Sequence, residues 1–332
     1  MLRRAFTFSG FVIALVLFIT VIFSNQPCCG QEHTEEIPYN KLKFNFYDVE
    51  FASPLQGWIC GKAGVLYHTK NGGITWKKQE TRTLNSLFEL TFVTINTGWV
   101  VGQGGLILAT TDGGETWVQQ KSHIENHLFS LYFVDKNHGC VVGDWGKILI
   151  TEDGGKNWID VSFDQDIILY DIDLISTTEG YMTSEFGIIY HTTDGGRTWE
   201  RVFEELDEIG YGTTNFTIAF DQSGKGIAAG VEGTILTSSD GKNWERKPQL
   251  SVKSVYNILL SNGKGLAVGD SATIFETEDS GASWKQIRVP DVLTTCWLRG
   301  VSRIGNDKYI ISGQHGLILF IKDSEIFWPG KK

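Results

Sequence analysis

Short apolar runs, many with alternating polar positions, recur along the chain and are separated by glycine-rich turns. In one repeat, residues 87–93 alternate, and the runs 98–102, 106–110 and 116–119 follow. Period-two runs of this length predict β-strands rather than helices. Four such strands in a repeat of about 40 residues are typical of one propeller blade.

A turn motif marks each repeat and gives the number of blades. It reads T-T-D-G-G-E-T-W at residues 110–117, and copies begin at residues 69, 151, 192, 237 and 277. A degenerate seventh copy ends at Trp328, and the closing tryptophans are 40 to 45 residues apart. Seven copies predict an all-β, seven-bladed propeller of four-stranded antiparallel blades over residues 41–332.

The residues of this motif, the Asp box, suit a structural role. An aspartate at a hairpin turn accepts backbone N–H bonds from residues two positions on, and the next glycine adopts a positive φ. The closing tryptophan adds apolar area between blades. The acidic spacing and final glutamate of an EF-hand loop are missing, so we expect no metal site. The residues assigned to this role are Asp112, Asp153, Asp194, Asp240, Asp279, Trp76, Trp117, Trp158, Trp199, Trp244 and Trp284.

The N-terminus has the features of an export signal. Arg3 and Arg4 precede an apolar segment over residues 11–23, and the small residues Cys28 and Gly30 follow. This pattern predicts a signal peptide over residues 1–30 and a polar tether over 31–40. Three alternatives stay open: a twin-arginine signal, a lipid on one of the two cysteines before Gly30, and a retained membrane anchor.

Charge limits the class of partner. The chain of 332 residues has a net charge of −10, and removal of residues 1–30 would leave −12. Nucleic-acid binding and docking on an anionic membrane need clustered cations, so we expect neither, apart from a possible N-terminal anchor. Three cysteines would remain, and an odd number does not make a disulfide framework.

The repeats resemble the Asp-box repeats of sialidases and sortilin-type propellers. The fuller pattern, such as G-W-V-V-G-Q-G-G-L-I at residues 98–107 before an Asp box, is similar to the photosystem II stability/assembly factor family. The resemblance covers about residues 40–328. It implies a periplasmic or lumenal propeller without catalytic activity or cofactor that assists protein assembly; an extracellular location stays open. The chain departs from the basic face expected of such a factor, since Arg82 and Arg299 form no cluster in the sequence.

A glycan-binding or sialidase-like glycoside hydrolase propeller is the rival hypothesis. A sialidase needs several arginines around a carboxylate, a tyrosine nucleophile and an acid/base carboxylate. Its N-terminal R-I-P-like segment is absent, and the nearest match, at residues 288–290, lies between repeats six and seven. No Walker loop or zinc spacing appears, so we assign no catalytic residues.

We expect partner binding on the loops between the second and third strands. These loops share one face with the connections between blades, whereas the Asp boxes lie on the opposite face. Aromatic side chains at the tips of such loops predict a partner anchor, with packing on a neighbouring loop as the alternative. Acidic neighbours favour a basic protein or peptide, bound by a monomer. The predicted binding residues are Trp145, Phe186, Asp144, Glu185, Glu232, Asp270 and His315.

Two further patterns concern acidic and aromatic positions. Residues 204–208 form either a solvated loop or an acidic lip for a basic segment. On the innermost strands, one repeat position predicts an aromatic core ring of Tyr47, Phe88, Phe129, Tyr170, Phe216 and Tyr256. The next position includes Asp48, Glu89 and Asp171, which we expect to bond neighbouring backbone or water, with binding of a cation or of a partner's basic tail as the alternative.

The missing arginine clamp yields a first prediction. The purified protein should not hydrolyse a fluorogenic sialoside or other aryl glycosides. Release of the fluorophore that persists through a second, orthogonal purification would contradict it.

Overall fold

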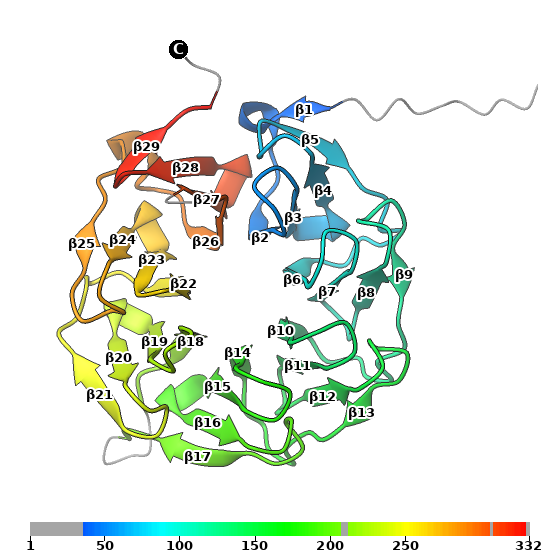
Figure 1. The fold of residues 1–332 in the computed structure, drawn as a ribbon, viewed down its shortest axis with the longest axis vertical. Helices are drawn as coiled ribbons and strands as arrows, with labels where there is room; N and C mark the ends of the chain where they lie inside the picture. The colour runs from blue at the N-terminus through cyan, green and yellow to red at the C-terminus, as the bar shows by residue number, and fades with distance from the viewer. Residues whose placement is uncertain (1–35, 207–211, 306–307, 330–332) are drawn as a thin grey trace, which may run out of the picture. The chain divides into compact units, whose positions relative to one another are not determined.

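Each repeat folds as one four-stranded antiparallel sheet, and seven sheets form a ring (Figure 1). The computed structural model describes residues 36–206, 212–305 and 308–329. The four strands of each repeat run in chain order from the centre of the ring to its outside, and a short strand at residues 37–38 is added to the outer edge of the first sheet. The predicted seven-bladed all-β propeller is thereby confirmed. The predicted signal peptide lies outside the described residues.

The strand bounds follow the repeats closely. Blade one contains β2 (Phe46–Phe51), β3 (Gly57–Gly61), β4 (Leu66–Thr69) and β5 (Thr75–Lys78). Blade two contains β6 (Leu87–Phe92), β7 (Gly98–Gly102), β8 (Ile107–Thr110) and β9 (Val118–Gln119). Blade three contains β10 (Leu128–Phe133), β11 (Gly139–Gly143), β12 (Ile148–Thr151) and β13 (Ile159–Asp160). Blade four contains β14 (Leu169–Leu174), β15 (Gly180–Ser184), β16 (Ile189–Thr192) and β17 (Glu200–Phe203).

The last three blades repeat this plan. Blade five contains β18 (Asn215–Phe220), β19 (Gly226–Gly230), β20 (Ile235–Ser238) and β21 (Trp244–Lys247). Blade six contains β22 (Val255–Ser261), β23 (Lys264–Gly269), β24 (Ile274–Thr277) and β25 (Lys285–Gln286). Blade seven contains β26 (Leu298–Arg303), β27 (Lys308–Gly313), β28 (Ile318–Lys322) and β29 (Glu325–Phe327).

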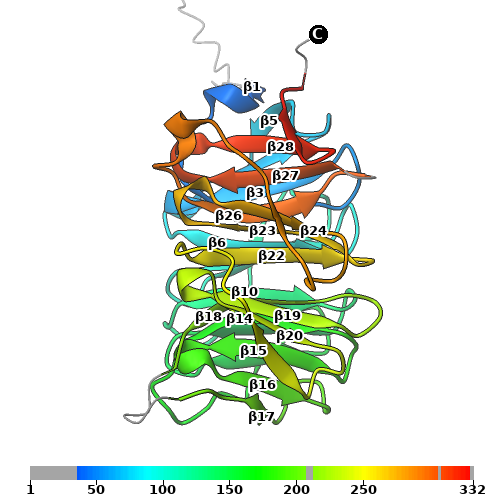
Figure 2. The same cartoon turned by 90° about the vertical axis from the view of Figure 1, so that its left-hand side faces the viewer.

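The sheets stack side by side around the ring, so each blade is covered on both faces (Figure 2). Second strands such as β7 and β11 are therefore buried over their whole length. The up-and-down order of strands gives the ring two faces. The Asp-box face carries turns such as 110–117, and the loop face carries the second-to-third-strand loops and the blade connections.

The Asp box holds its turn with a network of side-chain bonds. In blade two, the Thr110 hydroxyl donates to Asp112 Oδ1 at 2.8 Å and accepts the N–H of Gly114 at 2.8 Å. Asp112 Oδ1 accepts the N–H of Thr116 at 2.9 Å, so the bond spans four residues rather than the expected two. Gly113 and Gly114 have φ values of 73° and 86°, which glycine adopts without steric penalty.

Two copies of the turn differ. In blade five the box is one residue shorter, and the hydroxyl that bonds Asp240 comes from Ser238, not Thr237. Asp240 Oδ1 accepts the N–H of Lys242, two residues on as expected, and that of Asn243, three residues on. In blade seven a two-residue turn, Asp323-Ser324 with φ values of 52° and 60°, replaces the box. The degenerate copy at the end of the sequence is therefore an ordinary tight hairpin.

The boxes are also bonded to the preceding blade, which the repeat pattern alone did not suggest. Trp58 on β3 donates its indole N–H to Gly113 O at 3.0 Å, and Trp99 on β7 donates to Gly154 O at 3.1 Å. Each of these tryptophans lies on a second strand and reaches the Asp box of the following blade. The indoles that close the boxes pack among buried residues at the same junctions, as Trp76 and Trp117 do.

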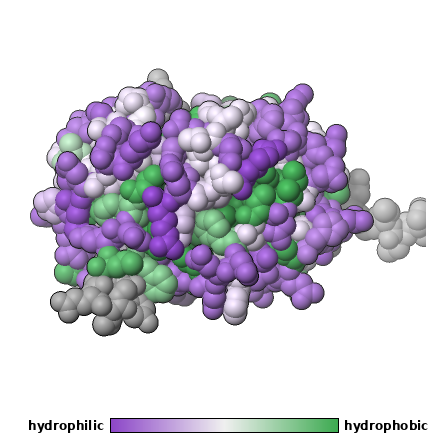
Figure 3. Space-filling model, turned by 90° about the horizontal axis from the view of Figure 1, so that it is seen from below, coloured by the Kyte–Doolittle hydropathy of each residue, from purple (hydrophilic) through white to green (hydrophobic). Residues whose placement is uncertain are grey.

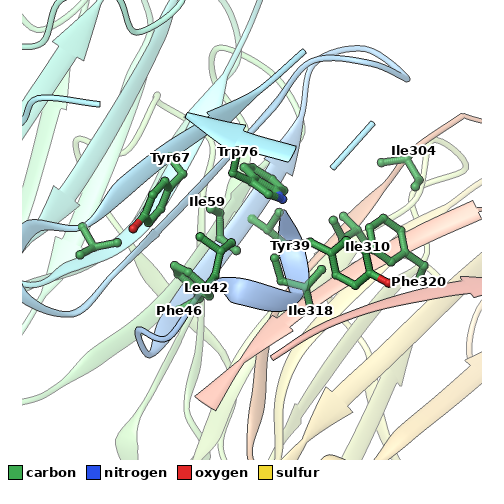
Figure 4. Packing of buried hydrophobic residues seen from close by; sticks show 12 residues of the cluster. Tyr39, Leu42, Phe46, Ile59, Tyr67, Trp76, Ile304, Ile310, Ile318 and Phe320 are labelled. Carbon is green, nitrogen blue, oxygen red and sulfur yellow. The ribbon is translucent and has the colours of Figure 1, made fainter. Parts of the chain in front are cut away.

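The ring closes where blade one meets blade seven (Figure 4). A short strand, β1 (Ile37–Pro38), pairs with β5, and the single turn η1 (Tyr39–Lys41) follows it. The Tyr39 ring contacts Phe320 of blade seven edge-on, with centroids 5.3 Å apart. Residues 37–40 thus belong to the propeller fold, which begins earlier than the expected boundary at residue 41.

Side chains of one blade bond the innermost strand of the next. Asp48 Oδ2 accepts the N–H of Leu90 in blade two at 3.0 Å. Similar bonds join blade two to three, three to four, four to five and five to six, with acceptors Glu89, Ser130, Asp171 and Thr217. We call these five residues the acceptor belt. Its members accept bonds from the backbone of the neighbouring blade, as expected from the sequence for Asp48, Glu89 and Asp171.

A wider cavity lies between the acceptor belt and the Asp-box face. Its volume is about 430 Å³, and the later halves of the innermost strands line it. Glu50 accepts the N–H of Phe92 at 2.9 Å here, and Asp173 accepts that of Phe220 at 2.7 Å. Burial is the main cause that raises the pKa of Asp173 to about 7 and that of Asp48 to about 6.

Trp117→Ala should lower the free energy of unfolding by roughly 3–5 kcal/mol, because it removes a buried indole that contacts Phe92 edge-on. Urea denaturation followed by circular dichroism measures the change. The matched control is Trp145→Ala, since Trp145 is exposed and should change stability by less than about 0.5 kcal/mol. Equal unfolding midpoints for the two variants would contradict this.

Asp173→Asn should raise stability at pH 8 and not at pH 4. The folded-state pKa of about 7 exceeds the unfolded value of about 3.9, so the folded protein binds this proton more tightly and loses stability as pH rises between them. Asparagine keeps an acceptor for the Phe220 N–H and removes the buried charge. The gain at pH 8 should be at most about 4 kcal/mol.

The measurement of stability against pH needs a control carboxyl whose pKa is lowered by folding instead of raised. Hydrogen bonds from Thr116 lower the pKa of Asp112, so an Asp112→Asn variant should differ from the parent by a constant amount between pH 5 and 8. A flat difference for Asp173→Asn over the same range would show that its carboxyl is ionised throughout.

Candidate functional site

The loops between second and third strands share one backbone conformation. In each of the seven loops the middle residue has a φ between 52° and 70°, and the residue after it also has a positive φ. Two consecutive residues in the left-handed region form the tight turn that asparagine and glycine favour. Five of the loops are single turns: η2 (Lys62–Gly64), η3 (Glu185–Gly187), η4 (Val231–Gly233), η5 (Asp270–Ala272) and η7 (Gln314–Gly316).

Trp145 occupies the middle position in blade three, between β11 and β12. Its φ is 55°, and 57% of the residue is exposed. A bulky side chain is disfavoured in this backbone region, and exposure of an indole gains nothing for the fold. The turn is held on one side by Asp144, whose Oδ1 accepts the N–H of His127 at 2.9 Å. Trp145 is therefore a solvent-exposed indole on a turn that a hydrogen bond holds in place.

Phe186, at the same position in blade four, differs from the expected exposed anchor. It is half-buried and packs against a buried cluster that includes Ile188 and Tyr190. This is the packing alternative that the sequence left open. Its neighbour Glu185 accepts the N–H of Ile168 at 3.0 Å, as Asp144 does for His127. Both carboxylates thus fasten the blade connection beside their own turn.

The other predicted residues lie around the same face. Glu232 and His315 are exposed middle residues of their turns, and Asp270 begins the turn in blade six. Three connections between blades add exposed apolar side chains: Leu84, Val252 and Val292 are 84%, 81% and 80% exposed. The loop face therefore presents acidic groups and scattered apolar groups around the ring.

The predicted acidic lip is partly neutralised. Glu204 pairs with Arg201 at 3.2 Å, and Glu205 pairs with Arg246 at 2.6 Å. Residues 207 and 208 of the lip lie outside the described residues. Two of its carboxylates thus have partners within the protein and offer less attraction to a basic segment.

The predicted aromatic ring exists, but it lines the mouth of the central channel instead of lying in a core. Consecutive ring centroids are 5.1–6.4 Å apart, and the side chains are half-buried. The mouth belongs to the loop face because the innermost strands begin there. We call these six side chains the aromatic collar: Tyr47, Phe88, Phe129, Tyr170, Phe216 and Tyr256.

Arg299 takes the seventh collar position, on β26. Its Cζ atom lies 5.8 Å from the centroid of the Tyr47 ring. The ring of Trp297, two residues before Arg299, stacks on the ring of Tyr47, with centroids 5.7 Å apart and an interplanar angle of 11°. The sequence comparison of repeats missed Arg299, although the break in the aromatic pattern at the seventh repeat was a visible signal.

His127 links the collar to the Trp145 turn. Its ring lies 6.2 Å from the rings of both Phe88 and Phe129, while its backbone N–H bonds Asp144. The exposed indole and the channel mouth therefore belong to one continuous part of the loop face.

Other surfaces offer less organised features. The outer wall of the ring is mainly hydrophilic with interrupted apolar patches in the view of Figure 3. In the part of the chain that the structure describes, no three histidine, cysteine or carboxylate side chains are grouped to hold a metal ion. Within the same residues, no helix has the length and apolar character to cross a membrane.

Three solved structures share the fold. A structure of YCF48 bound to D1 peptide has a TM-score of 0.68 and 20% identity, with 87% of this chain and 94% of that chain covered. YCF48 from Cyanidioschyzon merolae gives 0.67 and 16%, with 87% and 98% covered. An ancestral GH74 enzyme gives 0.68 and 17%, with 88% of this chain but 47% of that chain covered. At these identities the likeness shows the propeller fold alone.

Sequence comparison goes further than the fold. The chain is 35% identical over 49 residues to the photosystem II stability/assembly factor HCF136, chloroplastic, of Arabidopsis thaliana, a match that covers 15% of this chain and 12% of that protein. The family model of the photosynthesis system II assembly factor YCF48 matches residues 31–123 and 116–209, more than half of the chain. The chain therefore belongs to the photosynthesis system II assembly factor YCF48 family.

Proposed function

We propose that this chain is an exported, non-catalytic scaffold that binds a protein or peptide partner on its loop face during assembly. Family membership supports the class of function, and a member of the same family has been solved with D1 peptide bound. The observation that carries the proposal is the exposed indole of Trp145, mounted on a turn that favours glycine.

The mounting of Trp145 suits an interface anchor. Tryptophan is enriched among residues that dominate binding energy, and a rigid turn reduces the entropy lost on association. The Asp144 carboxylate bonds the backbone of His127, so the turn is already in place before a partner arrives. The other blades show that the ring does not need an aromatic residue here, since Ala63 and Gly104 occupy the same position.

Charge on the loop face gives the partner its proposed character. Asp144, Glu185, Glu232 and Asp270 stand around the turns and would attract basic side chains that flank the anchored segment. Such partly exposed pairs change association rates and specificity more than they change affinity. Binding of this kind is weak enough to permit release after assembly.

Location and state follow from the same proposal. The protein would act as a monomer in the periplasm, the thylakoid lumen or outside the cell, either free or tethered through its N-terminus. Catalysis is not part of the proposal, because the likeness to the GH74 enzyme extends over 47% of that chain and concerns the fold.

Photo-crosslinking from the loop face tests the proposal. The protein with benzoylphenylalanine at position 145 should capture its partner on irradiation, and the same substitution at Val118 should not. Val118 is a suitable control because it is 64% exposed but lies on the outer strand β9. Capture of the same protein with equal yield from both positions would overturn the loop-face assignment.

Affinity for the captured partner gives the second measurement. Trp145→Ala should weaken binding by roughly 30-fold, the effect of an anchor worth about 2 kcal/mol. Phe186→Ala should lower the melting temperature instead, because Phe186 packs against a buried cluster that residues of blades three and four form. A folded Trp145→Ala variant with parental affinity would exclude Trp145 as the anchor.

A further inference from the structure

Arg299 is a charged residue at a position that aromatic side chains occupy in the other six blades. Its guanidinium contacts the ring of Tyr47 and interacts electrostatically with the Asp48 carboxylate, but within the described ranges no hydrogen bond or close ion pair joins its N–H groups to another side chain. A guanidinium carries five N–H donors in a planar fork that matches a carboxylate. An arginine held half-buried without an acceptor has its hydrogen-bonding capacity free for a ligand.

The aromatic collar brings three phenols to the same small space. Tyr47, Tyr170 and Tyr256 line it together with Arg299. Burial raises the pKa of Tyr170 and of Tyr256, and the positive charge of Arg299 opposes the rise at both. These two tyrosines belong to blades four and six. The positive charge of Arg299 therefore acts on phenols on other sides of the channel mouth as well as on its neighbour Tyr47.

The carboxylates beneath the collar do not use the fork of Arg299. Asp48, Glu89 and Asp171 line the same space from below. Each accepts a backbone N–H from the next blade, as members of the acceptor belt. Burial raises the pKa of Glu89 well above its usual range and that of Asp48 to about 6, and the positive charge of Arg299 opposes the rise at Asp48.

The size of the space limits what can enter. Its volume is about 30 Å³, and a cavity needs roughly 10–15 Å³ for one water molecule, so two oxygen-sized atoms fit. The two oxygens of a carboxylate match this volume and the fork of an arginine. The flat aromatic walls would pack against the carbon atoms that precede the carboxylate.

We propose that the aromatic collar and Arg299 form a carboxylate subsite that takes the chain end or an acidic side chain of the bound peptide. The subsite rests on the proposed function, because it lies on the loop face and His127 connects it to the Trp145 turn. The face then combines a cationic centre with an acidic surround, and it fits a peptide with an anionic tip and basic flanks.

Small probes test the subsite without the partner. Ligand-observed NMR titrations would compare N-acetylglycine, which carries a free carboxylate, with N-acetylglycinamide, which has nearly the same shape and no charge. The carboxylate should bind saturably in the millimolar range, and the amide at least about tenfold more weakly. Equal binding of the two probes, or no saturable binding of N-acetylglycine, would overturn the subsite.

Matched variants assign the binding to Arg299. Arg299→Gln should weaken N-acetylglycine binding at least about tenfold, and Arg299→Lys should bind with intermediate affinity because it keeps charge but loses the fork. Arg303→Gln is the control, since Arg303 lies on the same strand but lines the cavity toward the Asp-box face. Melting temperatures confirm that the variants fold; a folded Arg299→Gln variant with parental affinity overturns the assignment.

The two proposals fail separately. A subsite that binds N-acetylglycine through Arg299 stands even if position 145 captures nothing, and that outcome rejects the partner-binding face alone. Peptides of the captured region with a free end, an amidated end or an internal Glu→Gln change then identify the source of the carboxylate. If all three bind alike and unaffected by Arg299→Gln, the subsite has no part in partner binding.

Discussion

The innermost strand of each blade has a backbone edge with no strand beside it, and the structure depends on how that edge is satisfied. Buried N–H groups without acceptors destabilise a fold, and exposed strand edges invite aggregation. Among the described residues, each of the first five blades supplies a side-chain acceptor to the next, as Asp48 does for Leu90 and Asp171 for Ile218. The acceptor belt therefore fixes the spacing of the blades and, with it, the geometry of the channel mouth.

The belt changes its form where the ring closes. In blade seven the position of Asp48 is taken by Gly300, and a Cβ atom there would lie 2.4 Å from Ser312 Oγ and 2.6 Å from the Val49 nitrogen. The innermost strands β2 and β26 thus approach too closely for a side chain. Ser302, two residues on, accepts the N–H of Phe51 at 2.9 Å instead. Arg299 precedes Gly300, so the irregular junction is also where the aromatic collar is interrupted.

Features fixed by local chemistry could be predicted from the sequence, and features fixed by neighbouring blades could not. The Asp-box turns repeat every 40 to 45 residues, which gave the number of blades, and one repeat position gave the members of the aromatic collar but not their place at the channel mouth. The half-buried state of Phe186 depends on Tyr190 and the rest of a cluster assembled in three dimensions. The setting of Arg299 depends on six residues from six other blades, and the sequence signals it only as a break in the aromatic pattern at the seventh repeat.

The shared backbone of the second-to-third-strand loops separates the stability of the ring from its recognition chemistry. Each loop needs two residues with positive φ, and Gly104 and Ala63 show that a small middle residue satisfies this need. The middle side chain can therefore differ from blade to blade, although in blade four Phe186 packs against a buried cluster. A tryptophan at this place adds backbone strain and an exposed apolar surface, neither of which benefits folding. The partner binding that we propose would supply the compensation, and for this reason Trp145 is better evidence of function than the acidic groups around it.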